Sequence, residues 1–335
     1  MDTPILISVV VPVYSGQDYL TRLIAELAIV RTRWEAQGAP MRLGEVVLVD
    51  DAAIDSSPQL VDALSSEHSW IIPLHLMRNF GQHAATIAGI LHTSGDWIVT
   101  MDEDLQHPPA AIERLLRQAV EQQADVVYAR PESDVHEARS RDWASRGFKR
   151  LMVKLSGNPN VPHFSSFRLM RGALARAVSS VCGHDTYFDV AVSWFTTRVS
   201  FVTMMLKDER FIQKGESGYR LSKLLSHARR MLMSSQIKVI RICGLFGLAV
   251  VMLSILASIG LVLHYFLFPH ESLARGWTSL ALIGLFFGGF ISFIVGIALE
   301  YLSALVLVAH GKPIFFVVNR AQDGVLADYF SRTPA

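Results

Sequence analysis

Two long apolar runs near the C-terminal end of this chain constrain its fold more than any other feature. Residues 242–268 are almost uncharged, and residues 278–299 carry no charge at all. An α-helix needs about 20 apolar residues to cross a bilayer. A buried core helix is the alternative, but two runs in tandem, both rich in Gly, Leu and Phe, favour membrane helices. We therefore expect residues 239–309 to form a two-helix transmembrane anchor, with helices at about 240–268 and 277–300.

Basic residues on both sides of these runs predict the orientation of the anchor. The connecting residues 269–276 carry one arginine, whereas the outer flanks carry Arg229, Arg230, Lys238, Arg241, Lys312 and Arg320. By the positive-inside rule, both ends of the chain lie in the cytoplasm. We expect a multi-pass protein of the cytoplasmic (inner) membrane. Two-span anchors often associate, which leaves a homo-oligomer among the expected assemblies.

The segments on either side of the anchor differ in character. Residues 216–238 alternate Leu or Met with Lys or Arg at helical spacing, which is typical of an amphipathic helix on a membrane surface. Packing of that helix against a globular domain is the alternative. Residues 310–335 are expected to form a cytoplasmic tail, and their pattern predicts no role.

Charge and cysteine content exclude several classes of protein. The net charge of +1 predicts no nucleic-acid partner. Cys182 and Cys243 lie far apart, so neither a disulfide framework nor a zinc site is expected. Several histidines share no metal-ligand spacing and are expected to be structural or surface residues, among them His75, His83 and His107.

Short apolar segments alternate with helical patterns over residues 1–215. The expected strands are 5–13, 45–49, 71–76, 97–101 and 125–129, and helices are expected after Asp18 and over 82–92. Such alternation predicts βαβ units and a mostly parallel sheet. We therefore expect one α/β domain ahead of the membrane-associated part.

Two of the expected strands end in pairs of carboxylates. Asp50 and Asp51 follow one strand, and Asp102 and Asp104 follow another. Because the carboxyl ends of parallel strands meet at one edge of a sheet, both pairs can share a ligand. An Asp-rich turn and a helix cap are the alternatives for these pairs.

The spacing of Asp102 and Asp104 suits a hard cation. Two converging carboxylates are costly unless a cation neutralises them, and oxygen ligands suit Mg²⁺ or Mn²⁺. The sequence contains neither G-x-G-x-x-G nor G-x-x-x-x-G-K-[ST], so neither a dinucleotide fingerprint nor a P-loop supplies a phosphate site. Metal-bridged binding of a nucleotide diphosphate is the remaining interpretation.

Several motifs together resemble the GT-A glycosyltransferases of family 2. They are residues 8–14, 49–51, 78–82 and 101–109, followed by 167–170, 215–219, 300–302 and 312–313. The most similar branch is the polyprenyl-phosphate glycosyltransferases, which resemble dolichol-phosphate mannose synthase. The resemblance covers nearly the whole chain, and it is specific in combination although each motif alone is weak.

The resemblance implies metal-assisted transfer of a sugar, with inversion, from a nucleotide diphosphate sugar to a polyprenyl (undecaprenyl) phosphate. A UDP-sugar is the favoured donor. The implied nucleotide-binding residues are Pro12, Tyr14, Asp50, Asp51, Arg78 and Asp102. The implied metal ligands are Asp102, Asp104 and Gln106. The implied catalytic residues are Asp104, Arg130, Arg141, Ser145 and Arg210, and Ser217 and Tyr219 are implied on the acceptor and membrane side.

The chemistry of the implied reaction explains this set of residues. A lipid phosphate is already ionised at neutral pH, so its oxygen can attack the anomeric carbon without a strong base. The enzyme must supply alignment, charge neutralisation and a metal for the leaving diphosphate. Arginines that grip a phosphate bidentately suit this task. A solvated basic surface near anionic lipid is the alternative for Arg130, Arg141 and Arg210.

The chain departs from the family pattern at three places. Ala52 and Ala53 stand where Gly and Ser are common, Ser15 stands where Asn is usual, and residues 163–166 lack the usual carboxylates. These changes leave open the donor sugar and whether His163 or Ser166 replaces a carboxylate. Phe188 and Asp189 line a pocket or belong to the core.

The sequence also bears on three other functions. A processive polysaccharide synthase is disfavoured, because the chain lacks a Q-x-x-R-W motif and has too few spans. A glycosyltransferase that acts on another lipid acceptor stays open. An inactive membrane-anchored scaffold is disfavoured by the intact Asp51, Asp102, Asp104 and Gln106.

Overall fold

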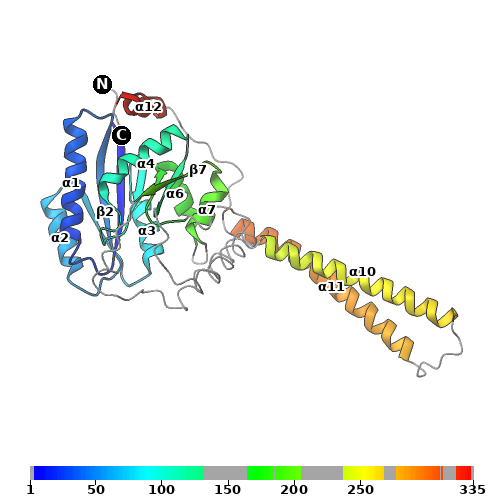
Figure 1. The fold of residues 1–335 in the computed structure, drawn as a ribbon. Helices are drawn as coiled ribbons and strands as arrows, with labels where there is room; N and C mark the ends of the chain where they lie inside the picture. The colour runs from blue at the N-terminus through cyan, green and yellow to red at the C-terminus, as the bar shows by residue number, and fades with distance from the viewer. Residues whose placement is uncertain are drawn as a thin grey trace, which may run out of the picture.

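A computed structural model describes residues 4–131, 164–183, 186–204, 237–267, 277–309, 311 and 322–332. An α/β domain carries helices on both faces of a central sheet, and a pair of long helices extends away from it (Figure 1). The expected α/β class is confirmed.

The sheet has seven strands in the order β3-β2-β1-β4-β6-β5-β7. Their bounds are β1 (Ile5–Val13), β2 (Met41–Asp50), β3 (Ile71–His75), β4 (Trp97–Thr100), β5 (Val126–Pro131), β6 (Arg168–Arg171) and β7 (Val199–Met204). Neighbouring strands are parallel except at β6, which is antiparallel to both β4 and β5. The prediction of a mostly parallel sheet is therefore confirmed, and each of the five predicted strands is present.

The helices of the α/β domain form two layers, and α10 and α11 lie outside them. Their bounds are α1 (Leu20–Ala36), α2 (Ser57–Glu67), α3 (Gln82–Leu91), η1 (Pro109–Ala111), α4 (Ile112–Glu121), α6 (Gly172–Val181), α7 (Phe188–Phe195), α10 (Ile237–Leu267), α11 (Trp277–Ala309) and α12 (Asp323–Arg332). Side chains of α1, α2, α4 and α12 share one hydrophobic core with the sheet, and side chains of α3, α6 and α7 share the other.

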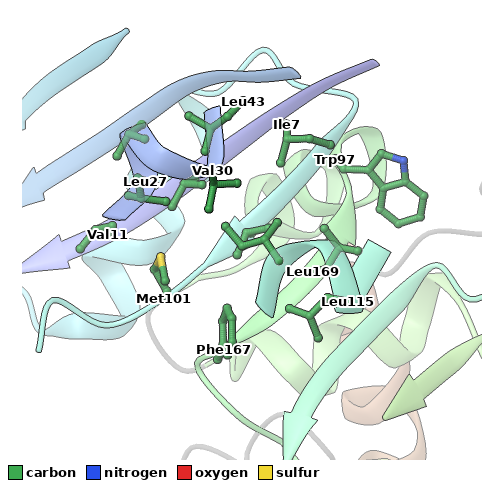
Figure 2. Packing of buried hydrophobic residues seen from close by; sticks show 14 of the residues in the cluster. Ile7, Val11, Leu27, Val30, Leu43, Trp97, Met101, Leu115, Phe167 and Leu169 are labelled. Carbon is green, nitrogen blue, oxygen red and sulfur yellow. The ribbon is translucent and has the colours of Figure 1, made fainter. Parts of the chain in front are cut away.

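Strand β1 is apolar at every position except the buried Ser8, because both of its faces are covered. Ile7 and Val11 face the first core, part of which is drawn in Figure 2, whereas Val10 faces the second. A parallel strand that is covered on both faces needs apolar residues at successive positions rather than at alternate ones. The continuous apolar run therefore places β1 at the centre of the domain.

Helix α3 lies unusually close to the sheet. A Cβ atom at Gly89 would lie 2.4 Å from Val10 Cγ1 and 2.8 Å from Val49 Cγ2, so only glycine allows this approach. The helix begins at Gln82, directly after Gly81, whose φ of 90° is a conformation that glycine adopts without strain. Close packing thus holds the first residue of α3 at the carboxyl edge of the sheet.

The long helices α10 and α11 pack against each other. A Cβ atom at Gly289 would lie 3.5 Å from Ser254 Cβ, which shows close contact between small residues of the two helices. Among the described residues, Leu280–Leu299 in α11 is the one segment long and apolar enough to cross a membrane, and the apolar part of α10, Leu248–His264, is shorter. The two-span anchor therefore stays a proposal.

Helix α12 returns to the α/β domain, although the sequence predicted no role for this segment. Leu326 and Phe330 are buried in the first core. Arg171 Nη2 donates hydrogen bonds of 2.9 and 2.7 Å to the two carboxylate oxygens of Asp323. Because Arg171 pairs with Trp97, the first residue of β4, this contact lies at the amino edge of the sheet.

Candidate active site

The ends of β1, β2 and β4 meet at the carboxyl edge of the sheet. Val13 at the end of β1 pairs with Asp50, and Asp51 N donates a hydrogen bond of 2.8 Å to Val13 O. Met101 N donates a hydrogen bond of 3.1 Å to Val10 O, so the residue that follows β4 still lies beside β1. The two acidic strand ends therefore lie at one edge, as expected.

Asp102 is held by two side chains from distant parts of the chain. Gln82 Nε2 donates to Asp102 Oδ1 at 2.6 Å, and Ser166 Oγ donates to Asp102 Oδ2 at 2.9 Å. Sequence reasoning placed Gln82 only within a family motif and left open whether Ser166 replaces a carboxylate, because no local pattern predicts contacts across 20 and 64 positions.

His107 fixes the backbone at the same point. Its Nδ1 accepts a hydrogen bond of 2.9 Å from Asp102 N, so the ring is a neutral acceptor at this atom. Burial lowers the pKa of His107, although the charges of Asp102 and Asp104 oppose that shift. The ring stacks on Phe167 with 4.9 Å between ring centroids. His107 is thus a structural residue, as expected, and it shapes the turn that carries the carboxylates.

Asp104 lies in that turn and is largely buried. Its Oδ1 accepts a hydrogen bond of 3.3 Å from Gln106 N, and Leu105 between them has a φ of 62°. This tight turn places the backbone N–H of Gln106 on the Asp104 carboxylate, and the metal-binding role implied for the two side chains stays a prediction.

Asp102 and Asp104 are suitable ligands for a divalent cation that a substrate also binds. No group of three His, Cys, Asp or Glu side chains that could hold a metal occurs among the residues that the structure describes. Mg²⁺ is usually bound by one or two carboxylates together with waters and phosphate oxygens. Asp102 and Asp104 supply two carboxylates, so a diphosphate would complete the set of ligands.

Glu103, between the two aspartates, has a structural task that the sequence did not reveal. Its carboxylate accepts hydrogen bonds from Tyr14 N at 2.9 Å and Ser15 N at 3.1 Å. A Cβ atom at Gly16 would lie 2.7 Å from Glu103 Oε2, so the loop after β1 wraps closely around this carboxylate. The loop leaves Tyr14 exposed at the site, two residues after the buried Pro12.

Asp51 connects the end of β2 to the loop before α3. Its carboxylate oxygens accept hydrogen bonds from Phe80 N at 2.7 Å and Gly81 N at 2.8 Å. The guanidinium carbon of Arg78 lies 4.5 Å from the centre of the Phe80 ring. Asp51 and Arg78 therefore belong to one wall of the site.

Asp50 forms the base of the same wall. Its Oδ1 accepts a hydrogen bond of 2.8 Å from Ala53 N, and its Oδ2 lies 2.9 Å from His75 Nδ1. His75 Nε2 lies 3.0 Å from Asp62 Oδ1. The hydrogen bond to Asp50 raises the pKa of His75.

Comparison with known proteins then decides the family. The family model described as glycosyl transferase family 2 matches residues 8–179, which is more than half of the chain and spans the whole edge described above. The chain belongs to glycosyl transferase family 2.

Two relatives match this family 2 glycosyltransferase over nearly its full length. Both are undecaprenyl-phosphate 4-deoxy-4-formamido-L-arabinose transferases. That of Edwardsiella ictaluri is 28% identical over 320 residues, which is 93% of each chain. That of Yersinia pestis is 29% identical over 315 residues, which is 93% of this chain and 92% of the relative.

A crystal structure of mannosyl-3-phosphoglycerate synthase from Rubrobacter xylanophilus is also similar. Its sequence is 14% identical, and the match covers 69% of this chain and 73% of that one, with a TM-score of 0.48.

Arg130 lies farther along the edge of the glycosyltransferase domain. It is on β5, which β6 separates from β4, and its guanidinium carbon lies 5.5 Å from the centre of the Phe201 ring. The other predicted residues lie outside the described part of the chain: His163, Arg141, Ser145, Arg210, Ser217 and Tyr219. Their roles stay predictions.

A buried charged cluster supports β5 and β6 beneath this part of the edge. Tyr128 Oη donates to Asp189 Oδ1 at 2.8 Å, and Arg168 Nη1 donates to the same oxygen. The Arg168 guanidinium carbon also lies 4.4 Å from the centre of the Phe188 ring. Burial, followed by the charge of Asp189, raises the pKa of Tyr128 well above its ordinary value. Phe188 and Asp189 therefore belong to the core, which was one of the two expectations for them.

Proposed function

We propose that this family 2 glycosyltransferase moves a sugar from a nucleotide diphosphate sugar to undecaprenyl phosphate at the cytoplasmic face of a membrane. The observation that carries the proposal is the similarity over 93% of the chain to transferases whose names give undecaprenyl phosphate as the acceptor. A match of this length includes the long helices as well as the α/β domain.

On the donor side, the nucleotide would lie between the β1 loop and the β2 wall. Pro12, Tyr14, Asp50, Asp51 and Arg78 would bind or shape the nucleoside pocket. A UDP-sugar is the favoured donor, and the family pattern does not choose among sugars. The changed residues Ala52 and Ala53 lie in this wall, where Ala52 has a φ of 51°.

Asp102, Asp104 and Gln106 would hold Mg²⁺ or Mn²⁺ together with the diphosphate. When bound, the cation would offset the charge that develops on the leaving diphosphate. The chain itself aligns the donor by holding Asp102 from two sides and by fixing the turn through His107. Alignment of this kind can supply a large part of the rate enhancement.

On the acceptor side, the lipid phosphate would attack with inversion at the anomeric carbon. Because the phosphate is already ionised, the protein needs cationic side chains more than a base. Arg130, Arg141 and Arg210 would bind the phosphate with Ser145, and Ser217 and Tyr219 would close over it from the membrane side. Strands β4 and β5 run in the same direction, because β6 between them is antiparallel to both, and the resulting position of Arg130 at the same sheet edge as Asp102 supports its role.

The long helices would anchor the enzyme as a two-span pair. Many apolar side chains of both helices are exposed, for example Leu253, Phe266, Leu280 and Phe286. A surface of this kind is stable in contact with lipid and prone to aggregation in water. An anchor next to the α/β domain would keep the site near a membrane-bound acceptor.

The first test is transfer by the purified full chain in lipid nanodiscs. The reaction contains undecaprenyl phosphate, Mg²⁺ or Mn²⁺ and a panel of nucleotide sugars, and mass spectrometry follows the lipid product. We expect a glycosylated lipid phosphate that forms only with metal. If a nucleotide sugar binds but no lipid product forms, the proposal of undecaprenyl phosphate as the acceptor is wrong, and another lipid acceptor has to be tested.

The matched variant is Asp104→Asn, which keeps the side-chain shape and removes the charge. Mutation of a group that only orients a metal ligand typically lowers metal affinity or activity by about 10–100-fold. Loss of the ligand itself should therefore lower the rate of transfer by at least about 100-fold. The control is Asp328→Asn on α12, where an exposed carboxylate pairs with the nearby Arg332. Normal metal-dependent turnover by Asp104→Asn would refute the assignment of the metal site.

A further inference from the structure

The carboxylate of Asp102 is restrained at both oxygen atoms. The amide of Gln82 donates to Oδ1, and the hydroxyl of Ser166 donates to Oδ2. The Asp102 side chain is 24% exposed, so without these donors it could adopt several rotamers on its turn. Two donors on opposite oxygens select one orientation of the carboxylate plane.

Each donor is held by its own part of the fold. Gln82 begins α3, which Gly89 holds tightly against the sheet, and Thr86 Oγ1 donates to Gln82 O at 2.8 Å. Ser166 precedes β6, and its carbonyl oxygen accepts a hydrogen bond of 2.6 Å from Thr100 Oγ1 at the end of β4. Donors that come from fixed elements can set geometry more accurately than donors on free loops.

The donors leave the carboxylate able to bind a further partner. A carboxylate offers about four lone-pair sites, of which Gln82 and Ser166 use two. Both donors are uncharged, so they orient Asp102 without neutralising it. Asp102 therefore keeps the negative charge and the free lone pairs that a metal ligand needs.

We propose that Gln82 and Ser166 are positioning residues that act through Asp102. They orient its carboxylate toward the divalent cation and diphosphate of the transfer reaction, and the inference rests on the function proposed above. Neither residue touches the reacting atoms. Partners of a metal ligand typically contribute 10–100-fold to metal affinity, and we expect that range here.

The test measures Mn²⁺ binding rather than turnover. The full chain in lipid nanodiscs is titrated with Mn²⁺, alone and in the presence of UDP, and electron paramagnetic resonance follows the free cation. Gln82→Ala and Ser166→Ala should each weaken Mn²⁺ binding by about 10–100-fold.

Conservative and matched variants separate positioning from a general structural role. Ser166→Thr retains a hydroxyl and should keep most of the affinity. Gln118→Ala removes a side-chain amide that donates to Ser200 Oγ at 2.9 Å, and Ser193→Ala removes a hydroxyl that donates to Val190 O at 2.6 Å. Both controls should bind Mn²⁺ like the unmodified chain.

The outcomes distinguish this inference from the proposed function. If Gln82→Ala and Ser166→Ala bind Mn²⁺ normally while Asp104→Asn binds it weakly, the positioning role is overturned but the proposed metal site is supported. Absence of Mn²⁺ binding in the unmodified chain, with or without UDP, would overturn the metal site and the positioning role together.

Discussion

The buried ion pair between Arg168 and Asp189 offers a prediction whose size follows from the structure. Each side chain is 6% exposed, and Tyr128 donates a further hydrogen bond to the same carboxylate. Asp189→Ala removes the only carboxylate that Arg168 contacts in the described part of the chain. A charge that is left buried without its partner costs about 3–5 kcal/mol.

The expected loss can be read as a change in melting temperature. For a domain of 150–250 residues, about 1 kcal/mol corresponds to roughly 2–4 °C, so Asp189→Ala should melt about 6–20 °C lower. Tryptophan fluorescence in detergent or nanodiscs would follow the transition. Tyr128→Phe leaves the ion pair intact and loses one hydrogen bond to a charged group, and it should cost about 1.5–3 kcal/mol.

A double variant tests the reasoning directly. If the cost arises from an unpaired buried charge, Arg168→Met together with Asp189→Leu should be more stable than Asp189→Ala alone, because no charge is then left buried. A melting temperature for Asp189→Ala within about 2 °C of the unmodified chain would refute the argument. A double variant less stable than Asp189→Ala would also contradict it.

Two further predictions concern the β2 wall and α12. The hydrogen bond to Asp50 raises the pKa of His75, so their pairing stabilises the fold fully below the ordinary histidine pKa of about 6.5 and is lost as pH rises through the higher folded value. Melting curves from pH 5.5 to 8.5 should show this loss in the unmodified chain but not in His75→Gln, and identical profiles would contradict it. Phe330→Ala should lower the free energy of unfolding by about 3–5 kcal/mol, because the ring is 5% exposed and lies 4.9 Å from the Arg117 guanidinium carbon. Denaturant unfolding would measure the loss, Val325→Ala on the exposed face is the control, and equal stability of the two variants would disprove the docking of α12.

The α/β class and five of the strands could be predicted because their signals are local. Strands β1 and β4 are buried throughout or nearly so, which requires the nearly continuous apolar runs that a short window of sequence shows. The carboxylates after β2 and β4 could be placed at one edge because parallel strands end on the same side.

Strand β6 could not be predicted in this way. It has four residues and carries Arg168 and Arg171 at its ends, both of them buried. Such charges are tolerated only because Asp189 and Asp125 pair with them from other elements. The stability of β6 therefore depends on partners that no local pattern contains.

The sequence alone determined the α/β class and the glycosyltransferase family, and the spacing of Asp102 and Asp104 at a strand end predicted metal assistance. The tertiary structure alone decided how that chemistry is held in place. Gln82 and Ser166 reach Asp102 from 20 and 64 positions away. The physical reason is that residue types and short-range spacing are properties of the chain, whereas hydrogen bonds between distant segments exist only once the sheet has brought those segments together.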